Sequence, residues 1–184
     1  MKDHQAIALL KQGDITGLEV LVRHYQDRAL RTAYLICLDA DMAQDVAQDA
    51  FLRAYRRIEQ FDIDRPFAPW FLRIVANQAL MAIRKRRRIR AFLDDALRES
   101  IPDPSSSIER TILNAETEGV VRDALTRLSP MQRTAVVCRY YLGLGEAEMS
   151  ELLGCPQGTV KRRLHDARQS LRRLLPGWIA GGTE

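Results

Sequence analysis

Two groups of cationic side chains are the residues whose chemistry is most readily assigned. From Arg84 to Arg90 every residue except Ile89 is Lys or Arg. A second group occupies residues 161–173 and consists of Lys161, Arg162, Arg163, Arg168, Arg172 and Arg173. Because guanidinium and ammonium groups neutralise phosphates, both groups indicate contact with a polyanion. The formal net charge is only +4, so the distribution of the charge supports this interpretation more than its total does.

Side chains that could build a catalytic or metal site are not arranged for one. Cys37, Cys138 and Cys155 are odd in number, far apart and without the close Cys or His spacing of a zinc site. No phosphate-binding loop and no nucleophile–base pair can be placed in the sequence. We therefore expect reduced, mostly buried thiols, no catalytic residue, no metal and no cofactor, which argues against an enzyme.

The pattern of apolar residues predicts an all-α protein. Aromatic residues make up only 7% of the chain, and Gly and Pro are few, which favours helices over sheets. Apolar residues recur at steps of three and four, and they predict helices over residues 18–36, 41–58, 69–90, 108–128, 130–141, 146–153 and 156–175. The segment 61–69 contains two prolines and is predicted to be a loop. No apolar run reaches the ~18 residues that would span a bilayer, so we expect a cytoplasmic protein.

A polar segment divides the chain into two small helical domains. Residues 94–107 contain acidic side chains, two prolines and three consecutive serines. Such a composition buries too little apolar surface to become ordered. The predicted organisation is a first domain over residues 1–93, a flexible acidic linker over 94–107 and a second domain over 108–184.

The second domain has the pattern of a helix-turn-helix. A short helix over 146–153 is followed by a turn at 154–156 and a longer basic helix. This arrangement seats the second helix in the major groove of DNA. Val160 begins an apolar stripe on one side of that helix, whereas Arg162 faces the other way and can donate twice to a guanine. The alternative is that Lys161, Arg162 and Arg163 only solvate a surface helix.

The predicted helix over 69–90 also has two different sides. Its apolar side contrasts with a side that carries Trp70, Arg73, Asn77, Met81 and Arg84. An aromatic ring, an amide and cations on one face are expected where a protein contacts duplex and unpaired bases together. The alternative for Trp70 is that it is a core residue which anchors the preceding loop.

These motifs resemble a known family, the extracytoplasmic-function (ECF) sigma factors of the sigma-70 family. The first domain resembles region 2 in residues 45–55, in Phe61, in residues 70–77 and in the basic run that follows. The second resembles region 4 in Glu148, residues 152–154 and residues 158–168. The resemblance extends from about Leu18 to Leu175 and implies an RNA polymerase sigma factor that directs promoter-specific initiation.

The resemblance implies a role for particular residues. The side chains that would dock on the clamp helices of the polymerase β′ subunit are Asp45, Gln48, Asp49 and Leu52. Asp49 has the alternative of an ion pair with Arg53. The loop over 61–69 would capture a base flipped from the minus-ten element, and the residues implied for that element are Phe61, Phe67, Trp70, Arg73, Asn77, Arg84, Arg86 and Arg87. Those implied for the minus-thirty-five element are Gly158, Thr159, Lys161, Arg162, Arg163 and His165.

The resemblance also implies the partners. These are core RNA polymerase, through its β′ clamp helices and β flap, and promoter DNA, both double-stranded and melted. Family members are often held by an anti-sigma factor, which makes such a partner a candidate here. The chain departs from the family pattern at Met81, where Asp is usual, at Arg162, where Ser is common, and at Met149 and Ser150, where Ile-Ala is usual. The alternative function is a free-standing helix-turn-helix regulator that acts without polymerase.

Overall fold

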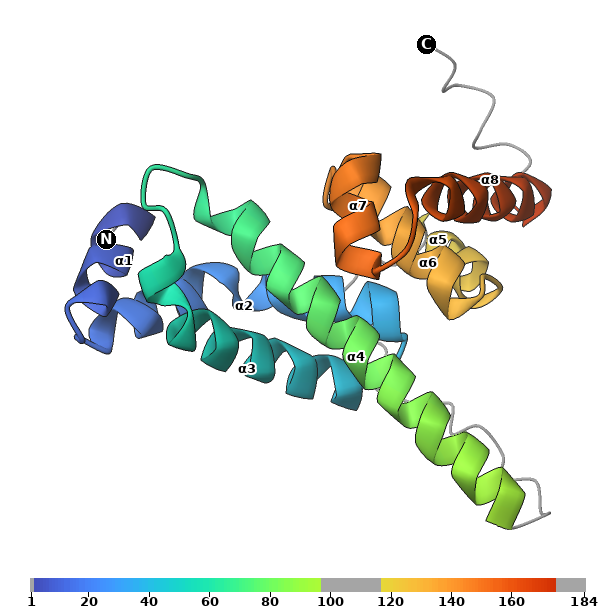
Figure 1. Ribbon diagram of the computed structural model, residues 1–184, viewed down its shortest axis with the longest axis horizontal. Helices are drawn as coiled ribbons and strands as arrows, with labels where there is room; N and C mark the ends of the chain where they lie inside the picture. Colours follow the sequence, from blue (N-terminus) through green and yellow to red (C-terminus); the bar gives the residue numbers. More distant parts are fainter. Residues whose placement is uncertain (1, 97–116, 175–184) are drawn as a thin grey trace. The chain divides into compact units, whose positions relative to one another are not determined.

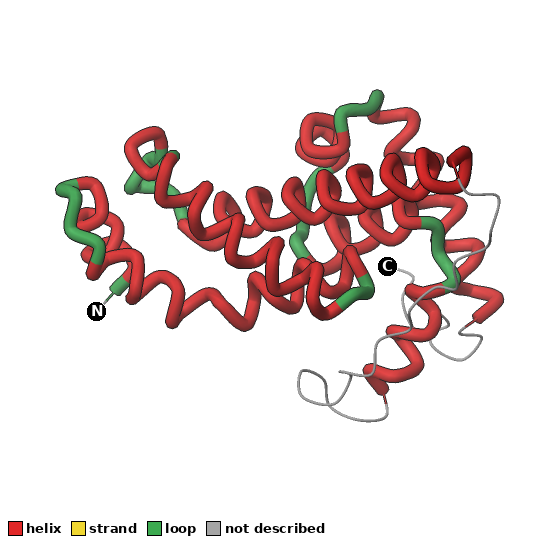
Figure 2. Tube along the Cα trace, turned by 90° about the horizontal axis from the view of Figure 1, so that it is seen from below, coloured by secondary structure: helices red, strands yellow, loops and turns green. Residues whose placement is uncertain are grey.

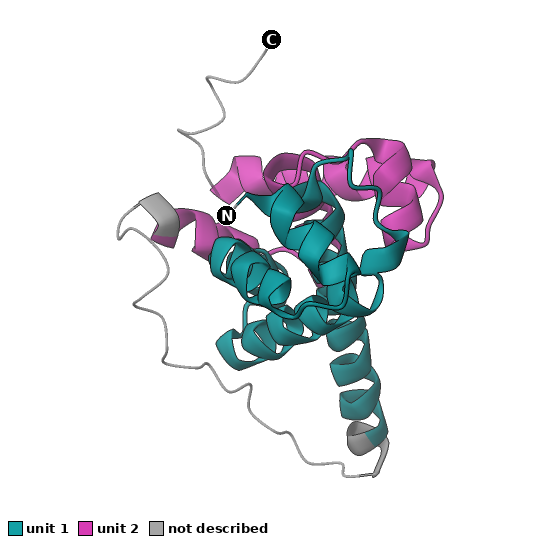
Figure 3. Cartoon of the chain, turned by 90° about the vertical axis from the view of Figure 1, so that its left-hand side faces the viewer, with its two compact units in different colours: residues 1–107 teal, residues 108–184 magenta. Residues whose placement is uncertain are grey.

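The computed structural model describes residues 2–96 and 117–174, and every regular element in these ranges is a helix (Figure 1). Accordingly, the trace in Figure 2 has no strand in these ranges. The all-α prediction is therefore confirmed. The chain divides into two compact units, residues 1–107 and 108–184 (Figure 3).

Unit 1 is a bundle of helices in which α2, α3 and α4 pack against one another. Its elements are α1 (Asp3–Lys11), α2 (Thr16–Cys37), α3 (Ala40–Arg56), the short 3-10 helix η1 (Ile58–Gln60) and α4 (Phe67–Ala96). Helix α1 lies against α2 and η1, and the C-terminal part of α4 extends beyond α2 and α3 (Figure 1). Many core positions are alanines, among them Ala29, Ala33, Ala43, Ala50, Ala54, Ala76 and Ala79. Small side chains at these positions let the helices approach closely, so the bundle is tight.

The observed helices differ from the predicted ones at several ends. Helix α3 ends at Arg56 rather than near Ile58, because Arg57 leaves the helical conformation and Ile58 belongs to η1. Helix α4 begins at Phe67, with Pro69 in its first turn, where proline removes no helical hydrogen bond. The same helix continues to Ala96, into the segment predicted to be linker. The rest of the predicted linker, residues 97–107, lies outside the described residues.

Helix α1 was not predicted, and a close approach of two backbones holds it in place. It buries Ala6, Ile7 and Leu10. A Cβ atom on Gly17 of α2 would lie 2.2 Å from the carbonyl oxygen of Ala6 and 3.0 Å from the backbone nitrogen of Leu10. The absence of a side chain at position 17 therefore permits the contact between α1 and α2.

In unit 2, helices α5, α6 and α7 pack against one side of α8. Its described elements are α5 (Thr117–Thr126), α6 (Pro130–Val136), the π-helical turn η2 (Val137–Tyr141), α7 (Glu146–Leu153) and α8 (Gln157–Leu174). Helix α5 was predicted to begin at residue 108, but residues 108–116 lie outside the described part of the chain. Ser129 caps α6 by accepting a hydrogen bond from the backbone nitrogen of Gln132. The predicted apolar stripe of α8 is buried at Val160, Leu164 and Ala167, whereas Leu171 and Leu174, which continue it, are half-buried.

We expect Gly17→Ala to destabilise the full-length protein by ~1–3 kcal/mol, because the new methyl group meets backbone atoms that cannot rotate away. The free energy of unfolding from urea titrations, followed by circular dichroism, measures this effect. Gly119→Ala on α5 is the control, since a Cβ there meets nothing within 4 Å and alanine favours a helix. A Gly17→Ala protein as stable as the parent would contradict the close approach.

Candidate DNA and polymerase interface

The exposed side of α3 carries the four residues predicted to contact polymerase. Asp45, Gln48, Asp49 and Leu52 are all exposed, whereas Val46 is buried on the opposite side of the helix. We call these four residues the α3 ridge. Leu52, the apolar member of the ridge, is 44% exposed. The ridge therefore combines negative charge with an accessible apolar group.

Two hollows flank the α3 ridge and differ in character. The hollow between α2 and α3 has a volume of about 420 Å³, and its lining includes Leu18, Val22, Leu30, Phe51 and Leu52. We call it the apolar groove. The hollow between α3 and α4 has a volume of about 970 Å³, and its lining includes Asp41, Asp45, Asp49, Lys85 and Arg88. The ridge thus has an apolar border on one side and a charged border on the other.

The alternative pairing of Asp49 is not seen. Within the described ranges no ion pair joins Asp49 to Arg53, although both residues line the hollow between α3 and α4. The carboxylate of Asp49 is therefore available to a partner on the exposed side of the helix.

An aromatic cluster supports the loop between η1 and α4. Phe61 and Phe67, at the two ends of the loop, are buried, and their ring centroids lie 5.6 Å apart. The Trp70 ring lies 4.8 Å from Phe61 and 5.5 Å from Phe67. Trp70 is half-buried, so it is not the core residue of the alternative, although its ring contacts with Phe61 and Phe67 anchor the loop. The rings of Phe61 and Phe67 are buried within unit 1, so they support the loop and are not exposed at its surface.

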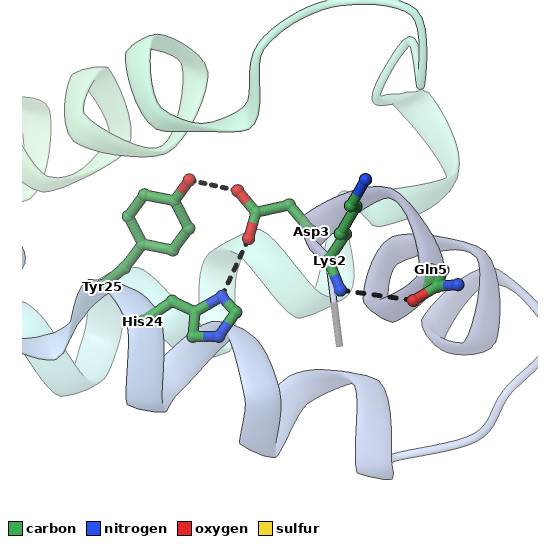
Figure 4. A network of polar contacts seen from close by, with 5 residues as sticks. All are labelled: Lys2, Asp3, Gln5, His24 and Tyr25. Carbon is green, nitrogen blue, oxygen red and sulfur yellow. Dashed lines mark hydrogen bonds and ion pairs between the residues drawn. The ribbon is translucent and has the colours of Figure 1, made fainter.

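Tyr25 connects this cluster to α1. Its ring lies 5.2 Å from that of Phe67, and its hydroxyl donates a hydrogen bond to the carboxylate of Asp3. The other carboxylate oxygen of Asp3 lies 2.9 Å from Nδ1 of His24 (Figure 4). Burial, together with the hydrogen bond to Asp3, raises the pKa of Tyr25 to about 12. Burial alone would raise the pKa of Asp3, but the contacts with Tyr25 and His24 outweigh it and lower that pKa.

The residues predicted on α4 are mostly on its accessible side. Asn77 and Met81 are exposed and Arg73 is half-buried. Farther along, Arg84, Arg87 and Arg88 line one shallow hollow. From Arg73 onward, the predicted residues on this side of α4 are polar or basic, apart from the exposed Met81.

Arg86 has a structural partner that periodicity does not reveal. Its guanidinium donates to the carboxylate of Asp39 over 2.7 Å. Asp39 also caps α3, because its other carboxylate oxygen accepts a hydrogen bond from the backbone nitrogen of Met42 over 2.9 Å. Arg86 therefore joins the start of α3 to the basic part of α4. The position of Asp39 before a helix is a capping signal that could have identified it.

The turn between α7 and α8 lies where the sequence predicts it. Gly154 has a φ of 61°, a left-handed conformation that glycine adopts without strain. The backbone nitrogen of Cys155 donates to the carbonyl of Ser150 over 3.1 Å, and the Ser150 hydroxyl donates to the carbonyl of Cys155 over 2.7 Å. These bonds hold the turn, and they give Ser150 a structural role where the family usually has Ala.

The cations of α8 have different surroundings. The Arg162 side chain is 85% exposed, and its Nε lies 3.9 Å from the Asp166 carboxylate. Lys161 lies 3.4 Å from the carboxylate of Glu146. Arg163 is half-buried and donates to Sγ of Cys155 over 3.3 Å, so it is bound to the turn. Of these three cations, Arg162 extends farthest into solvent.

The other predicted residues of α8 lie close to Arg162. Gly158 is exposed and Thr159 is half-buried in the first turn of the helix. His165 is exposed, and its ring nitrogen lies 3.1 Å from the Gln169 amide nitrogen. The start of α8 is therefore open at Gly158, where a Cβ atom would meet nothing within 4 Å, while longer side chains extend from the next turn.

Two helical units, the second with a helix-turn-helix whose basic helix is exposed, define a helix-turn-helix DNA-binding protein. The family model "Sigma-70 region 2" matches residues 21–89, and "Sigma-70, region 4" matches residues 118–171. The ECF RNA polymerase sigma factor SigW of Bacillus subtilis is 32% identical, over 92% of this chain and 94% of that protein. RNA polymerase sigma-H factor of Pseudomonas aeruginosa is 31% identical, over 95% of this chain and 94% of its own. The chain belongs to the ECF group of the sigma-70 family of RNA polymerase sigma factors.

Solved structures have the same fold. CnrH in complex with the cytosolic domain of CnrY is 24% identical, with a TM-score of 0.59 over 96% of this chain and 98% of that chain. The sigma factor RpoE in complex with the anti-sigma factor NepR, from Bartonella quintana, is also 24% identical. Its TM-score is 0.62, over 87% of this chain and 97% of that chain. Family membership implies that the present chain binds core RNA polymerase and promoter DNA.

The described residues contain neither a membrane-spanning helix nor a metal-binding cluster. None of the helices there is long and apolar enough to cross a membrane. Residues 2–96 and 117–174 contain no group of His, Cys, Asp and Glu side chains that could hold a metal ion.

Proposed function

We propose that this sigma factor directs promoter-specific initiation by dividing recognition between its two units. Unit 1 binds the clamp helices of the β′ subunit and opens the minus-ten element, while unit 2 binds the β flap and the minus-thirty-five element. The observation that carries this proposal is Arg162, an 85% exposed guanidinium just after a helix-turn-helix turn. Working with polymerase on promoter DNA, the protein would act in the cytoplasm, without a cofactor or a catalytic residue of its own.

The α3 ridge is the proposed contact with the clamp helices. It lies on a rigid helix, and its carboxylates can steer a basic partner surface while Leu52 supplies apolar area. The apolar groove beside it offers further area to a helix of the partner. An anti-sigma factor that covered the ridge and the groove would keep polymerase away. The complex of RpoE with the anti-sigma factor NepR supports a partner of this kind.

The minus-ten element is assigned to the loop over 62–66 and to the exposed side of α4. Extruding a base from a duplex costs a few kcal/mol, which a supporting pocket must repay. The accessible part of Trp70 and the Asn77 amide could supply such contacts. The Phe61 and Phe67 rings would act indirectly, by holding the loop in shape.

The minus-thirty-five element is assigned to the first turns of α8. Arg162 is placed to donate to a base edge, since its contact with Asp166 is long and exposed ion pairs contribute little. Lys161 can exchange its carboxylate partner Glu146 for a phosphate. Arg163, bound to Cys155, would keep the turn in position for both.

Reversing the charge of the α3 ridge tests the contact with polymerase. We expect Asp45→Lys combined with Asp49→Lys to weaken binding to core polymerase by at least ~10-fold, because like charges then oppose each other at the interface. Fluorescence titration of labelled sigma factor with core enzyme measures the affinity. Glu59→Lys, an exposed reversal away from the ridge, should bind as the parent does. Equal affinities for all the proteins would show that polymerase binds elsewhere.

Two neighbouring variants separate base reading from backbone contact in unit 2. In holoenzyme, Arg162→Ala should reduce the free energy of binding to promoter DNA by ~1–3 kcal/mol and relax the base preference at one position of the minus-thirty-five element. Lys161→Ala should weaken binding to all DNA sequences alike. It should also lower, by about one unit, the slope of the logarithm of the binding constant against the logarithm of the salt concentration. Arg172→Ala, an exposed cation near the far end of α8, serves as the control and should leave base preference unchanged. Binding-site selection at several salt concentrations provides the measurement, and an unchanged preference in Arg162→Ala would remove that residue from the readout.

A further inference from the structure

Helix α1 contacts the proposed base-capturing loop at its entry. The ammonium group of Lys11, at the end of α1, donates a hydrogen bond to the carbonyl oxygen of Phe61 over 2.7 Å. Phe61 is the residue at which the chain leaves η1 and becomes extended, with φ −78° and ψ 126°. Hydrogen bonds from a charged donor are stronger than neutral ones. Lys11 therefore holds the first peptide group of the loop.

The same helix is connected to the exit of the loop. Asp3, at the other end of α1, accepts a hydrogen bond from the hydroxyl of Tyr25 (Figure 4). The Tyr25 ring packs against Phe67 at the start of α4. The packing of α1 on α2 at Gly17 sets the position of the whole helix. One short helix is thus connected to both ends of the loop, directly at Phe61 and through Tyr25 at Phe67.

The middle of the loop is held mainly by contacts within itself. The carboxylate of Asp62 accepts a hydrogen bond from the backbone nitrogen of Asp64 over 3.1 Å. It also forms an ion pair with Nε of Arg65 at 3.2 Å. These groups are exposed, so such contacts hold the turn weakly. The position of the loop relative to α4 then depends on its two ends.

We infer that Lys11 is a positioning residue for base capture at the minus-ten element, acting through the Phe61 carbonyl and without touching DNA. This inference rests on the proposed function of the loop. A base pocket distinguishes bases only when its donors and acceptors are held in place, and small displacements reduce that selectivity. Loss of the Lys11 bond should therefore reduce discrimination among bases more than it reduces binding of polymerase.

The test uses holoenzymes made from full-length parent and variants. Fork templates, whose non-template strand is already unpaired over the minus-ten element, carry one base substitution each. The affinity of holoenzyme for the template with the preferred base, divided by its affinity for the substituted template, measures base capture without the free-energy cost of melting. We expect Lys11→Met to lower this ratio by ~10-fold, the scale of one hydrogen bond to a charged group. Lys11→Arg, which restores a charged donor, should keep the ratio within ~2-fold of the parent.

The control is Lys2→Met, which removes the same charge from the exposed start of α1 and should behave as the parent. Amide exchange on the full-length proteins adds a second measurement. In Lys11→Met, exchange should quicken over residues 61–65 while the amides of α2, α3 and α4 keep their protection.

The outcomes distinguish this inference from the function on which it rests. A parent that directs initiation, with a Lys11→Met variant that discriminates bases equally well, would overturn the inference alone. An Arg variant as defective as the Met variant, or unchanged exchange over 61–65, would also overturn it. A parent that fails to direct initiation with core polymerase would overturn the proposed function and the inference together.

Discussion

The burial of one side of α4 is the constraint on which unit 1 depends. Phe71, Val75, Ala79 and Leu80 on this helix are completely buried against α2 and α3. Since successive residues of a helix point in different directions, fixing the buried side also fixes where Asn77 and Arg84 are presented. Packing therefore determines which groups lie on the exposed side of α4. Over residues 67–92 of α4 the last buried residue is Ile83, so the basic residues that follow it extend past the core.

In unit 2, too, the buried residues of a helix determine which of its side chains are exposed. Val160 and Leu164 are buried and orient α8, while Gly154 and the bonds between Ser150 and Cys155 set the angle at which α8 leaves the turn. Arg163 contributes to the turn and Arg162 does not. Adjacent arginines thus have different tasks, one within the fold and one at its surface. Exposure alone does not reveal this, but the partner of each guanidinium does.

The sequence predicts the long helices well because their apolar residues repeat over many turns. Helix α7 has the predicted bounds and α2 begins and ends within two residues of them. Helix α1 is too short to show a clear period, and it was missed. The contacts of Lys11 with Phe61 and of Arg86 with Asp39 join residues 50 and 47 positions apart, so no local pattern contains them. The exposed positions of the α3 ridge follow from helix geometry. That Arg163 is bound to the turn while Arg162 is exposed could be seen only in the structure.

Run-off transcription with purified core polymerase over a promoter library tests the central claim most directly. The account predicts transcripts from defined start sites that appear only when the protein is added. Their yield should fall when either the minus-thirty-five or the minus-ten element is altered. Tight and specific binding to promoter DNA by the protein alone, with no transcripts when core polymerase is present, would contradict the account.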